Sequence, residues 1–388
     1  MYEIGQPEIR AVTKVLQSGQ LFRYRGGEGG WCDRFEAALA KKVGVKYALL
    51  NTSGTASLIC AMAGIGVEPG DEVIVPAYTF MASALAPLAA GAIPIIAEID
   101  ETLMLDPKDV EKKITRYTKA VMPVHMVGRV CNLAAFMRIG RRHHLKIVED
   151  ACQAVGGSYR GRRLCSIGHA GAFSFNFFKN ITCGEGGAVM TSDLNVYDRA
   201  LIYHDGGSVF RKYAEKLKTP FFAGANFRAS EILGAIMFEQ LKRLDGILAR
   251  LRERQSAMLE ELAKSSRYRI CPTNEERGDC GSHAAVIFEK AEEAQAFVKA
   301  VAEKKLGGAY RPYDTGRHVY FNWDPIMKKH GSHTAKLNPY NWAKRKIEYA
   351  QDMCPRSLDI MARTVLIGVP YHATVAEVRT LSRKIAAL

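Results

Sequence analysis

Short apolar runs alternate with amphipathic segments over most of the first 245 residues. In WCDRFEAALAKKVG, for example, apolar residues recur three or four positions apart, which is typical of a helix packed on one face. The runs that predict strands are KYALLN, DEVIVP, AIPIIAEID, TKAVMPV, HLKIVED, AGAFSFNFF and GAVMTS. Because strands alternate with helices, we predict an α/β fold with a mostly parallel central sheet and helices on both faces.

A long amphipathic stretch at residues 230–265 separates this region from the rest of the chain. We interpret it as the bridge between a large domain, residues 1–245, and a smaller C-terminal α+β domain, residues 246–388. The smaller domain contains the apolar runs SHAAVIF and RTVLIGV and ends in the helical pattern ATVAEVRTLSRKIAAL. Ligands of such sheets bind at the carboxyl ends of the strands. Those ends read NTSGT, PAYTF, VHMVG and EDACQ.

Composition narrows the class of protein. Hydrophobic residues make up 48% of the 388 residues and charged residues 24%, as in ordinary globular proteins. No run approaches about 18 uninterrupted apolar residues and no basic leader is visible, so we expect a cytoplasmic protein without a membrane span. The nine cysteines form no CxxC pair and predict no disulfide framework and no metal site. The net charge of +14 favours an anionic small substrate over nucleic acid, because the basic clusters lack interleaved aromatics.

The stretch SFNFFKNITCGEGG, residues 174–187, places one lysine among aromatic and apolar residues. Phe177, Phe178 and Ile181 would desolvate the Lys179 ammonium and lower its pKa, which makes a better nucleophile toward a carbonyl. The alternative is an ordinary surface lysine. Pyridoxal 5'-phosphate needs such an amine, together with a carboxylate facing its ring nitrogen, an anion cradle and a flat group against its ring.

Candidates exist for the carboxylate and the flat group. Asp150 ends the apolar strand KIVED, and strand alternation points Glu149 to the opposite face. The alternative for Asp150 is a helix N-cap. Gln153 is within reach of the cofactor's phenolic oxygen. Phe80 is the candidate for stacking on the ring, with Tyr78 second, and the alternative for both is core packing.

The anion cradle is predicted in TSGTAS. Thr52, Ser53, Gly54 and Thr55 lie between a strand and a helix, where backbone N–H groups and hydroxyls converge at the positive end of the helix. A plain capping turn is the alternative. Ser174, five residues before the lysine, offers a further hydroxyl.

In this order and spacing, the motifs resemble the DegT/StrS family of sugar aminotransferases, whose fold is the type I, aspartate-aminotransferase-like fold of PLP-dependent transferases. The motifs are TSGTASL, VPAYTFMAS, PVHMVG, EDACQAVGGSYRG, FSFNFFKN, CGEGGAV and NFRASEILGA. The resemblance covers about residues 1–245. It implies a homodimer with active sites at the subunit interface, glutamate or glutamine as amino donor, and a keto or aldehydo sugar as acceptor. Several phrases are most similar to the branch that makes 8-amino octulosonate.

The resemblance also implies roles for cofactor-binding residues. It makes Lys179 the Schiff-base lysine and general acid/base, and Asp150 the partner of the pyridine nitrogen. Gln153 becomes the contact to the phenolic oxygen. The phosphate ligands that it implies are Gly54, Thr55 and Ser174.

Its implications for the substrate are fewer. Asn226 would reach the phosphate of the neighbouring subunit, and Arg228 would lie near the donor's carboxylate or the sugar. The small-domain segment that usually carries a His-Tyr-x-Pro motif reads AYRPYDTGRHVYFNWDP here. His318, Tyr320 and Trp323 are the substrate contacts that we expect from it.

Three other functions fit parts of the pattern. A sugar dehydratase of the same fold replaces the lysine with histidine, and Lys179 counts against it. An aminotransferase/dehydratase acting on a cyclic ketone, as in amino-cyclitol or aminohydroxybenzoate synthesis, would keep the lysine. A basic binding or regulatory protein on this scaffold would keep the phosphate cradle without needing a desolvated lysine.

Overall fold

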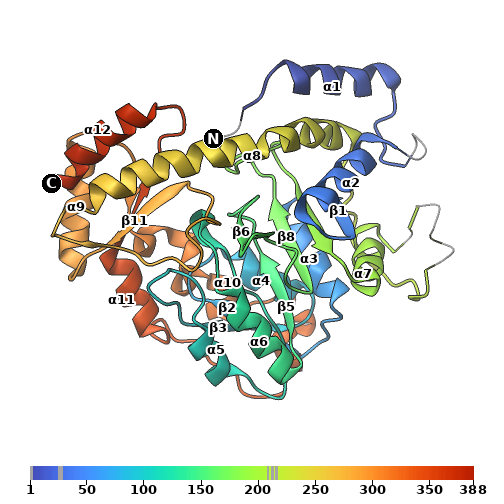
Figure 1. The fold of residues 1–388 in the computed structure, drawn as a ribbon. Coiled ribbons are helices and arrows are strands. Elements are labelled where there is room, and N and C mark those ends of the chain that lie inside the picture. The colour runs from blue at the N-terminus through green and yellow to red at the C-terminus, as the bar shows by residue number, and fades with distance from the viewer. Residues whose placement is uncertain (1–2, 25–28, 208, 211–213, 215–216) are drawn as a thin grey trace.

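A seven-stranded sheet lies at the centre of the molecule (Figure 1). The computed structural model describes residues 3–24, 29–207, 209–210, 214 and 217–388. The strand order is β1-β9-β8-β5-β4-β2-β3. The strands are β1 (Tyr47–Asn51), β2 (Glu72–Pro76), β3 (Ile93–Ala97), β4 (Thr118–Val121), β5 (Lys146–Asp150), β8 (Ala170–Ser174) and β9 (Gly187–Thr191). All seven predicted strands are therefore present.

Most of this sheet is parallel. β3, β2, β4, β5 and β8 run in one direction, and only β9 is antiparallel to its neighbours β8 and β1. Every residue of β2, β3, β8 and β9 is buried, which explains their continuous apolar runs. The parallel order brings the carboxyl ends of β2, β4, β5 and β8 to one edge of the sheet.

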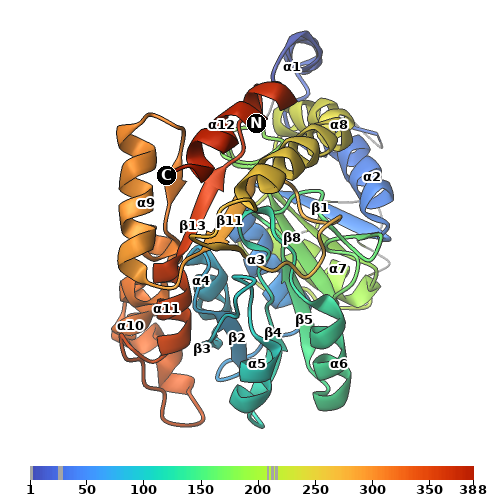
Figure 2. The same cartoon turned by 60° about the vertical axis from the view of Figure 1, so that its left-hand side comes forward.

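Helices cover both faces of the sheet, as Figures 1 and 2 show. They are α2 (Trp31–Val43), α3 (Gly54–Gly64), α4 (Ala82–Ala89), α5 (Pro107–Lys113), α6 (Leu133–His143) and α7 (Leu194–His204). At the start of α3 the Ser53 hydroxyl accepts a hydrogen bond from the Ala56 N–H at 3.0 Å, and so Ser53 is an N-cap. The predicted α/β fold is confirmed.

One long helix, α8 (Glu231–Leu262), runs from the large sheet to the C-terminal part of the chain. The predicted domain boundary near residue 245 lies inside it, and the division stays a prediction. α1 (Gln6–Ser18) lies along α8, where Ala11, Val15 and Ala235 form a small separate apolar cluster. Among the described residues, α8 included, no helix combines the length and the apolar character that crossing a bilayer requires.

The C-terminal part contains a four-stranded antiparallel sheet of order β10-β11-β13-β12. Its elements are β10 (Arg269–Ile270), β11 (His283–Ile287), α9 (Ala291–Glu303), β12 (Ala309–Tyr310), α10 (Asp324–Met327), α11 (Pro355–Arg363), β13 (Thr364–Gly368) and α12 (Val375–Ala386). Short elements elsewhere are β6 (Ser158–Tyr159), β7 (Arg162–Arg163), η1 (Met126–Gly128), η3 (Pro312–Asp314), η4 (Gly316–His318), η5 (Tyr320–Asn322), η6 (Ala335–Leu337) and η7 (Pro339–Trp342).

Parts of the connection between β12 and α11 pack against the large sheet. The Thr79 N–H donates to the His318 carbonyl at 2.9 Å, and Tyr78 forms a bridge with Val319. Farther along, the Tyr349 hydroxyl donates to the Pro94 carbonyl at 2.6 Å. A C-terminal segment thus closes one side of the space beyond β2.

Candidate active site

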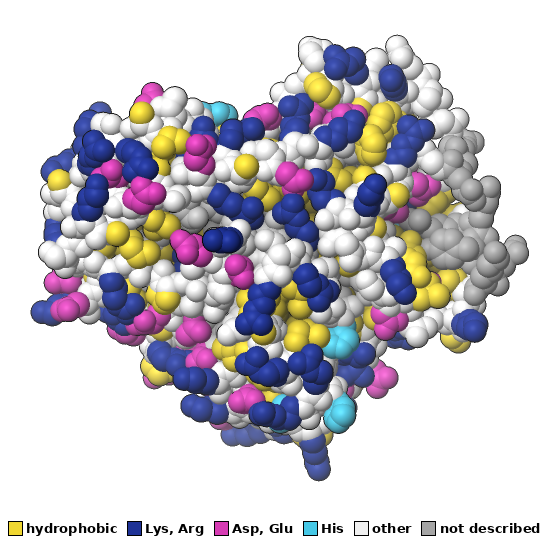
Figure 3. Space-filling model, viewed as in Figure 1, with side chains coloured by type: hydrophobic (Ala, Val, Ile, Leu, Met, Phe, Trp, Pro, Cys, Tyr) yellow, Lys and Arg dark blue, Asp and Glu magenta, His cyan; other side chains and the backbone are white. Residues whose placement is uncertain are grey.

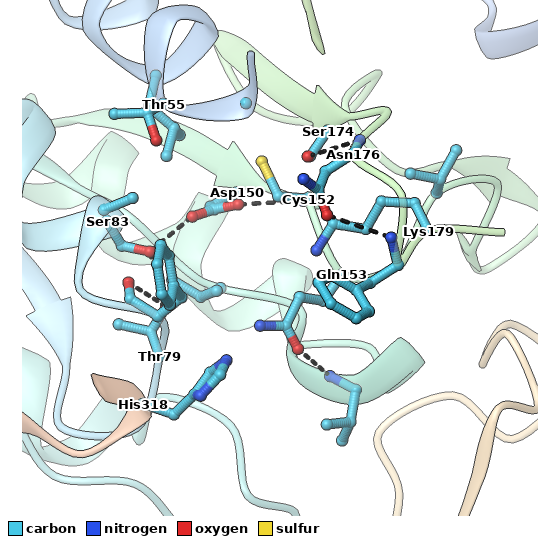
Figure 4. A pocket seen from close by; sticks show the side chains of 18 of the residues that line it. Thr55, Thr79, Ser83, Asp150, Cys152, Gln153, Ser174, Asn176, Lys179 and His318 are labelled. Carbon is cyan, nitrogen blue, oxygen red and sulfur yellow. Dashed lines mark hydrogen bonds between the residues drawn. The ribbon is translucent and has the colours of Figure 1, made fainter. Parts of the chain in front are cut away.

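A cavity of about 740 Å³ lies at the carboxyl ends of the parallel strands. Figure 4 shows that Asp150 and Lys179 reach it from different elements. The predicted site residues that line it are Ser53, Gly54, Thr55, Phe80, Asp150, Gln153, Ser174, Lys179 and His318. Residues from positions 53 to 318 therefore meet in one space.

Lys179 lies in the loop that joins β8 to β9. The loop is closed on itself, because the Phe175 N–H donates to the Gly186 carbonyl at 2.8 Å and the Lys179 N–H donates to the Asn176 carbonyl at 3.0 Å. The Asn176 side chain also donates to Glu185 Oε1 at 2.7 Å. These bonds hold the backbone that directs the Lys179 side chain into the cavity (Figure 4).

Two of the three residues expected to desolvate Lys179 are more exposed than that expectation implies. Ile181 is fully buried, but Phe177 and Phe178 are 57% and 78% exposed. The reason is the tight turn between Asn176 and Lys179, which places the two rings at the tip of the loop. Both rings are therefore largely open to solvent, and Phe178 lines the cavity together with Lys179.

The Asp150 carboxylate is held by two donors at the end of β5. Its Oδ2 accepts a hydrogen bond from the Ser83 hydroxyl at 2.7 Å, and its Oδ1 accepts from the Cys152 N–H at 3.0 Å. Ser83 is oriented in turn by the Thr79 hydroxyl, also at 2.7 Å. The residue is only 3% exposed. A carboxylate fixed in this way presents its remaining lone pairs to the cavity.

Glu149 points away from the cavity, as strand alternation predicts. Its carboxylate accepts three backbone hydrogen bonds, from Cys165 and Ile167 at 2.8 Å and from Gly168 at 2.6 Å. The buried His125 Nε2 lies 3.7 Å from Glu149 Oε2. Glu149 therefore fixes the end of β5, and with it the backbone of Asp150.

The start of α3 forms a cradle lined by Ser174. The N–H groups of Gly54 and Thr55 find no acceptor among the described residues, as is usual in the first turn of a helix. A Cβ atom on Gly54 would lie 2.7 Å from the Ser174 Cβ and 3.0 Å from the Cys152 Sγ. The missing side chain thus lets the start of α3 pack directly against Ser174 and Cys152, which brings the free N–H groups beside the Ser174 hydroxyl, where an anion can bind.

Three more predicted residues complete the lining. The Gln153 Oε1 accepts from the Val127 N–H at 3.3 Å, which leaves its amide N–H groups for the cavity (Figure 4). Phe80 is 41% exposed, and its ring centroid lies 5.4 Å from that of His318. Burial, and next the positive charge of Lys179, lower the pKa of His318, so this imidazole is neutral at pH 7.

Two expected substrate contacts lie outside the cavity. Tyr320 is fully buried, and its hydroxyl donates to the Gln351 carbonyl at 2.5 Å. Trp323 is also fully buried and donates its Nε1–H to the Arg317 carbonyl at 2.8 Å. Both side chains pack inside the segment that follows β12 and form hydrogen bonds there. The residue of this segment that faces the cavity is His318. Tyr78, the second candidate for ring stacking, is 1% exposed and packs in the core.

Asn226 and Arg228 do not line the cavity of their own chain. Asn226 is exposed, and its Oδ1 accepts from the Arg228 N–H at 3.3 Å. The Arg228 guanidinium forms an ion pair with Asp205 at 3.0 Å and lies over the rings of Phe22 and Phe210. Asn226 is thus exposed and Arg228 is half-buried, and neither reaches the cavity of its own chain.

The positive charge of the chain does not gather in the cavity. Among its described lining residues Lys179 is the only lysine or arginine, and it is accompanied by Asp150 and Glu185. Figure 3 shows lysine and arginine side chains spread over the outer surface instead. The expectation that the net charge serves an anionic substrate therefore has no support inside the pocket of one chain.

Several lining residues were not predicted from the sequence. Ser83 and Cys152 are next to Asp150, and Ser282, His283 and Tyr310 come from the C-terminal part. Ser83 had a detectable signal, because it stands one helical turn after Thr79 in PAYTFMAS. Burial and the Asp150 charge raise the pKa of Cys152 well above its usual value, which keeps this thiol protonated.

Comparison of the sequence with known proteins finds relatives that include a perosamine synthase and a cyclitol aminotransferase. GDP-perosamine synthase of Caulobacter vibrioides is 39% identical over 60% of this chain and 62% of its own length. L-glutamine:2-deoxy-scyllo-inosose aminotransferase of Streptomyces lividus is 38% identical over 66% of this chain and 63% of its own length. The chain thus matches less than two thirds of the length of these relatives.

Comparison of the structure extends over the whole chain. 3-Amino-5-hydroxybenzoic acid synthase has a TM-score of 0.81 and 27% identity over 100% of this chain and 97% of its own. DesV of S. venezuelae has a TM-score of 0.78 and 29% identity over 98% and 94%. The model of the DegT/DnrJ/EryC1/StrS aminotransferase family matches residues 2–385. The chain therefore belongs to the DegT/DnrJ/EryC1/StrS aminotransferase family.

Proposed function

We propose that this protein is an aminotransferase that uses pyridoxal 5'-phosphate to move an amino group from glutamate or glutamine to a keto or aldehydo sugar, or to a cyclitol ketone. One observation carries the proposal. An amine (Lys179), a carboxylate held by two donors (Asp150) and the N-terminus of α3 all line one cavity. When bound, the cofactor supplies an aldehyde and an electron-accepting pyridine ring.

The residues present fit this cofactor. The unpaired N–H groups of Gly54 and Thr55, with the Ser174 hydroxyl packed close to Gly54, would provide donors for its phosphate. Asp150 would accept a hydrogen bond from the protonated ring nitrogen and balance its charge. The N–H groups of Gln153 are donors for the phenolic oxygen.

The chain's own groups then carry the proton transfers. Lys179 is the only lysine or arginine among the described lining residues, and its Nζ would take the proton from the amino carbon of the donor. Phe80 offers a flat, half-exposed face against which the ring can lie. His318 is neutral, and it therefore offers a hydrogen bond to the substrate without adding charge.

We also propose a homodimer with shared sites. Asn226 is exposed, and the half-buried Arg228 lies over the rings of Phe22 and Phe210, which are 42% and 54% exposed. An exposed apolar cluster beside an arginine that is already oriented by an ion pair is typical of an interface. In a dimer, Arg228 would supply the positive charge for the donor's carboxylate that each cavity lacks.

Two acceptor classes remain in the proposal. An uncharged keto sugar or cyclitol suits a cavity whose described lining has no lysine or arginine except Lys179. An acidic octulosonate-type sugar is the weaker alternative, because its carboxylate would depend on a partner's cations. An aminotransferase that also dehydrates a cyclic ketone is a second function, favoured by the 27% identity to 3-amino-5-hydroxybenzoic acid synthase.

The two half-reactions test this function. Purified protein should be yellow, lose its visible absorbance with glutamate or glutamine, and regain it with one of a panel of keto-inositol, nucleotide-linked keto sugar and octulosonate aldehyde. Loss of water from the product, with a new aromatic absorbance, would identify the dehydrating alternative. A colourless protein, or a colour that neither donor changes, would leave only a binding function.

A further inference from the structure

The small sheet gives the cavity a polar wall that consists of Ser282, His283 and Tyr310. His283 begins β11 and pairs with Gly368 of β13, whose N–H donates to the Gly308 carbonyl at 2.9 Å. His283, Gly368 and Gly308 thus lie side by side across the sheet, and the two glycines have no side chain. Tyr310 lies two residues after Gly308 on the same face. Its ring can therefore reach back to His283, and its hydroxyl lies 3.2 Å from His283 Nε2.

The donor and the acceptor of each hydrogen bond in this wall can be assigned. The Ser282 hydroxyl donates to the Val127 carbonyl at 2.9 Å, so its oxygen accepts from His283 Nδ1 at 3.0 Å. Burial lowers the pKa of His283 to about 4, and its second nitrogen therefore carries no proton at pH 7. Burial also raises the pKa of Tyr310 to about 12, which keeps the phenol protonated. Tyr310 thus donates to Nε2, and its own oxygen receives no donor from the described residues.

We propose that the Tyr310 oxygen accepts a hydrogen bond from a hydroxyl group of the sugar or cyclitol acceptor. Tyr310 is then a specificity-determining residue, and His283 and Ser282 are positioning residues. The inference rests on the proposed aminotransferase function and deepens it. A hydroxyl brings the proton that this oxygen requires, whereas an ionised carboxylate or phosphate brings none. The wall therefore selects the uncharged, hydroxylated part of a substrate.

Val127 connects the wall to Gln153, one of the proposed cofactor-binding residues. Val127 accepts from Ser282 through its carbonyl and donates through its N–H to Gln153 at 3.3 Å. Its φ of 48° is uncommon for a β-branched residue and orients both groups in a single turn. The distance between the wall and Gln153 is therefore set by the backbone of one residue and two hydrogen bonds, which supports recognition of one hydroxyl.

Tyr310→Phe tests the inference in the holoenzyme, because it removes one oxygen and keeps the ring. Tyr313→Phe is the matched control, since Tyr313 is 36% exposed and does not line the cavity. We expect the half-reaction with glutamate to change by less than about twofold. We expect kcat/KM with the fastest acceptor of the panel to fall about 10-fold or more, because a buried polar partner loses its hydrogen bond.

Each outcome has one meaning. Equal losses in both half-reactions would mean that Tyr310 is structural, and an unchanged acceptor half-reaction would mean that it binds no hydroxyl; either overturns the inference while the proposed function stands. If wild-type protein shows no half-reaction with either donor, the proposed function fails instead.

A second measurement needs no turnover. In nitrogen NMR spectra of the holoenzyme, the His283 signals are identified by their absence in His283→Gln. Between pH 6 and 8 we expect His283 to be protonated on Nδ1 alone, and Tyr310→Phe to shift the Nε2 signal. An imidazolium at pH 6, or a proton on Nε2, would reverse the hydrogen-bond direction and refute the inference.

Discussion

The two halves of the cavity differ in how they are built. The half at the seven-stranded sheet, here named the large-domain half, uses residues at the ends of parallel strands, and Asp150, Ser174 and the start of α3 meet there because the sheet places them at one edge. The other half, here named the small-domain half, comes from β11, β12 and a segment of short 3₁₀ helices, and contributes His283, Tyr310 and His318. The first half holds charged groups, whereas the second presents neutral polar groups.

This difference separates two tasks. A preorganised carboxylate and a helix N-terminus suit a cofactor of fixed shape and charge. Neutral hydrogen-bonding groups suit the hydroxyls of a sugar, for which each bond contributes little but an unpaired buried group is costly. We therefore expect substitutions in the large-domain half to affect both half-reactions, and those in the small-domain half to affect mainly the acceptor.

Lys179→Ala should have the largest effect. It removes the amine of the cavity, so turnover should fall by at least about 10⁴-fold, and the visible absorbance of the bound cofactor should disappear. The control is Lys336→Ala, an exposed lysine of η6. Steady-state rates and absorbance spectra measure the change. A Lys179 variant with full activity would remove the basis of the proposed mechanism.

Asp150→Asn should come next. The amide keeps the shape of the side chain but cannot balance a protonated ring nitrogen, and we expect both half-reactions to slow by about 10²–10³-fold. Asp352→Asn, at an exposed position, is the control. Stopped-flow absorbance with each substrate separates the two halves. A slower acceptor half-reaction with an unchanged donor half-reaction would contradict the assignment of Asp150 to the cofactor.

His283 should make stability depend on pH. Its folded pKa of about 4 is below the unfolded value of about 6.5, so the unfolded state binds more protons at low pH. The stability that it provides is complete above about pH 6.5 and is lost as the pH falls toward 4. When the pH falls from 7 to 4.5, the free energy of unfolding of wild type should therefore fall by about 2–3 kcal/mol more than that of His283→Gln.

Urea unfolding at the two pH values measures this difference, and the exposed His330→Gln serves as control. Equal pH dependence in wild type and His283→Gln would show that His283 is not buried in its neutral form. The direction of the hydrogen bonds in the small-domain wall would then lose its support.

Gly54→Ala should have the smallest of these effects. The new methyl group would lie 2.7 Å from the Ser174 Cβ, and relieving that contact costs about 1–3 kcal/mol. We expect cofactor affinity to fall about 10-fold, measured by reconstitution of the apoprotein. Gly246→Ala is the matched control, because its methyl group meets only Arg250 at 3.4 Å. Unchanged affinity would place the phosphate elsewhere.

Sequence patterns predicted the large-domain half well. Strand alternation separated Asp150 from Glu149, and the turn after β1 identified Ser53, Gly54 and Thr55, because these signals depend on local periodicity. The small-domain half has no such signal. His283 and Tyr310 meet across a strand that follows them in the chain, and Tyr320 could not be distinguished from His318 within a segment of single-turn helices. The orientation of Phe177 and Phe178 depends on loop hydrogen bonds that no pattern encodes.

The segment after β12 has a consequence for any attempt to divide the protein. Through the Thr79 and Tyr349 hydrogen bonds, residues near the C-terminus are fastened onto strands formed far earlier in the chain. A fragment ending at the long helix would retain the amine and the phosphate turn but would lack His318, His283 and Tyr310. The cavity is thus complete only when the last quarter of the polypeptide packs against the first.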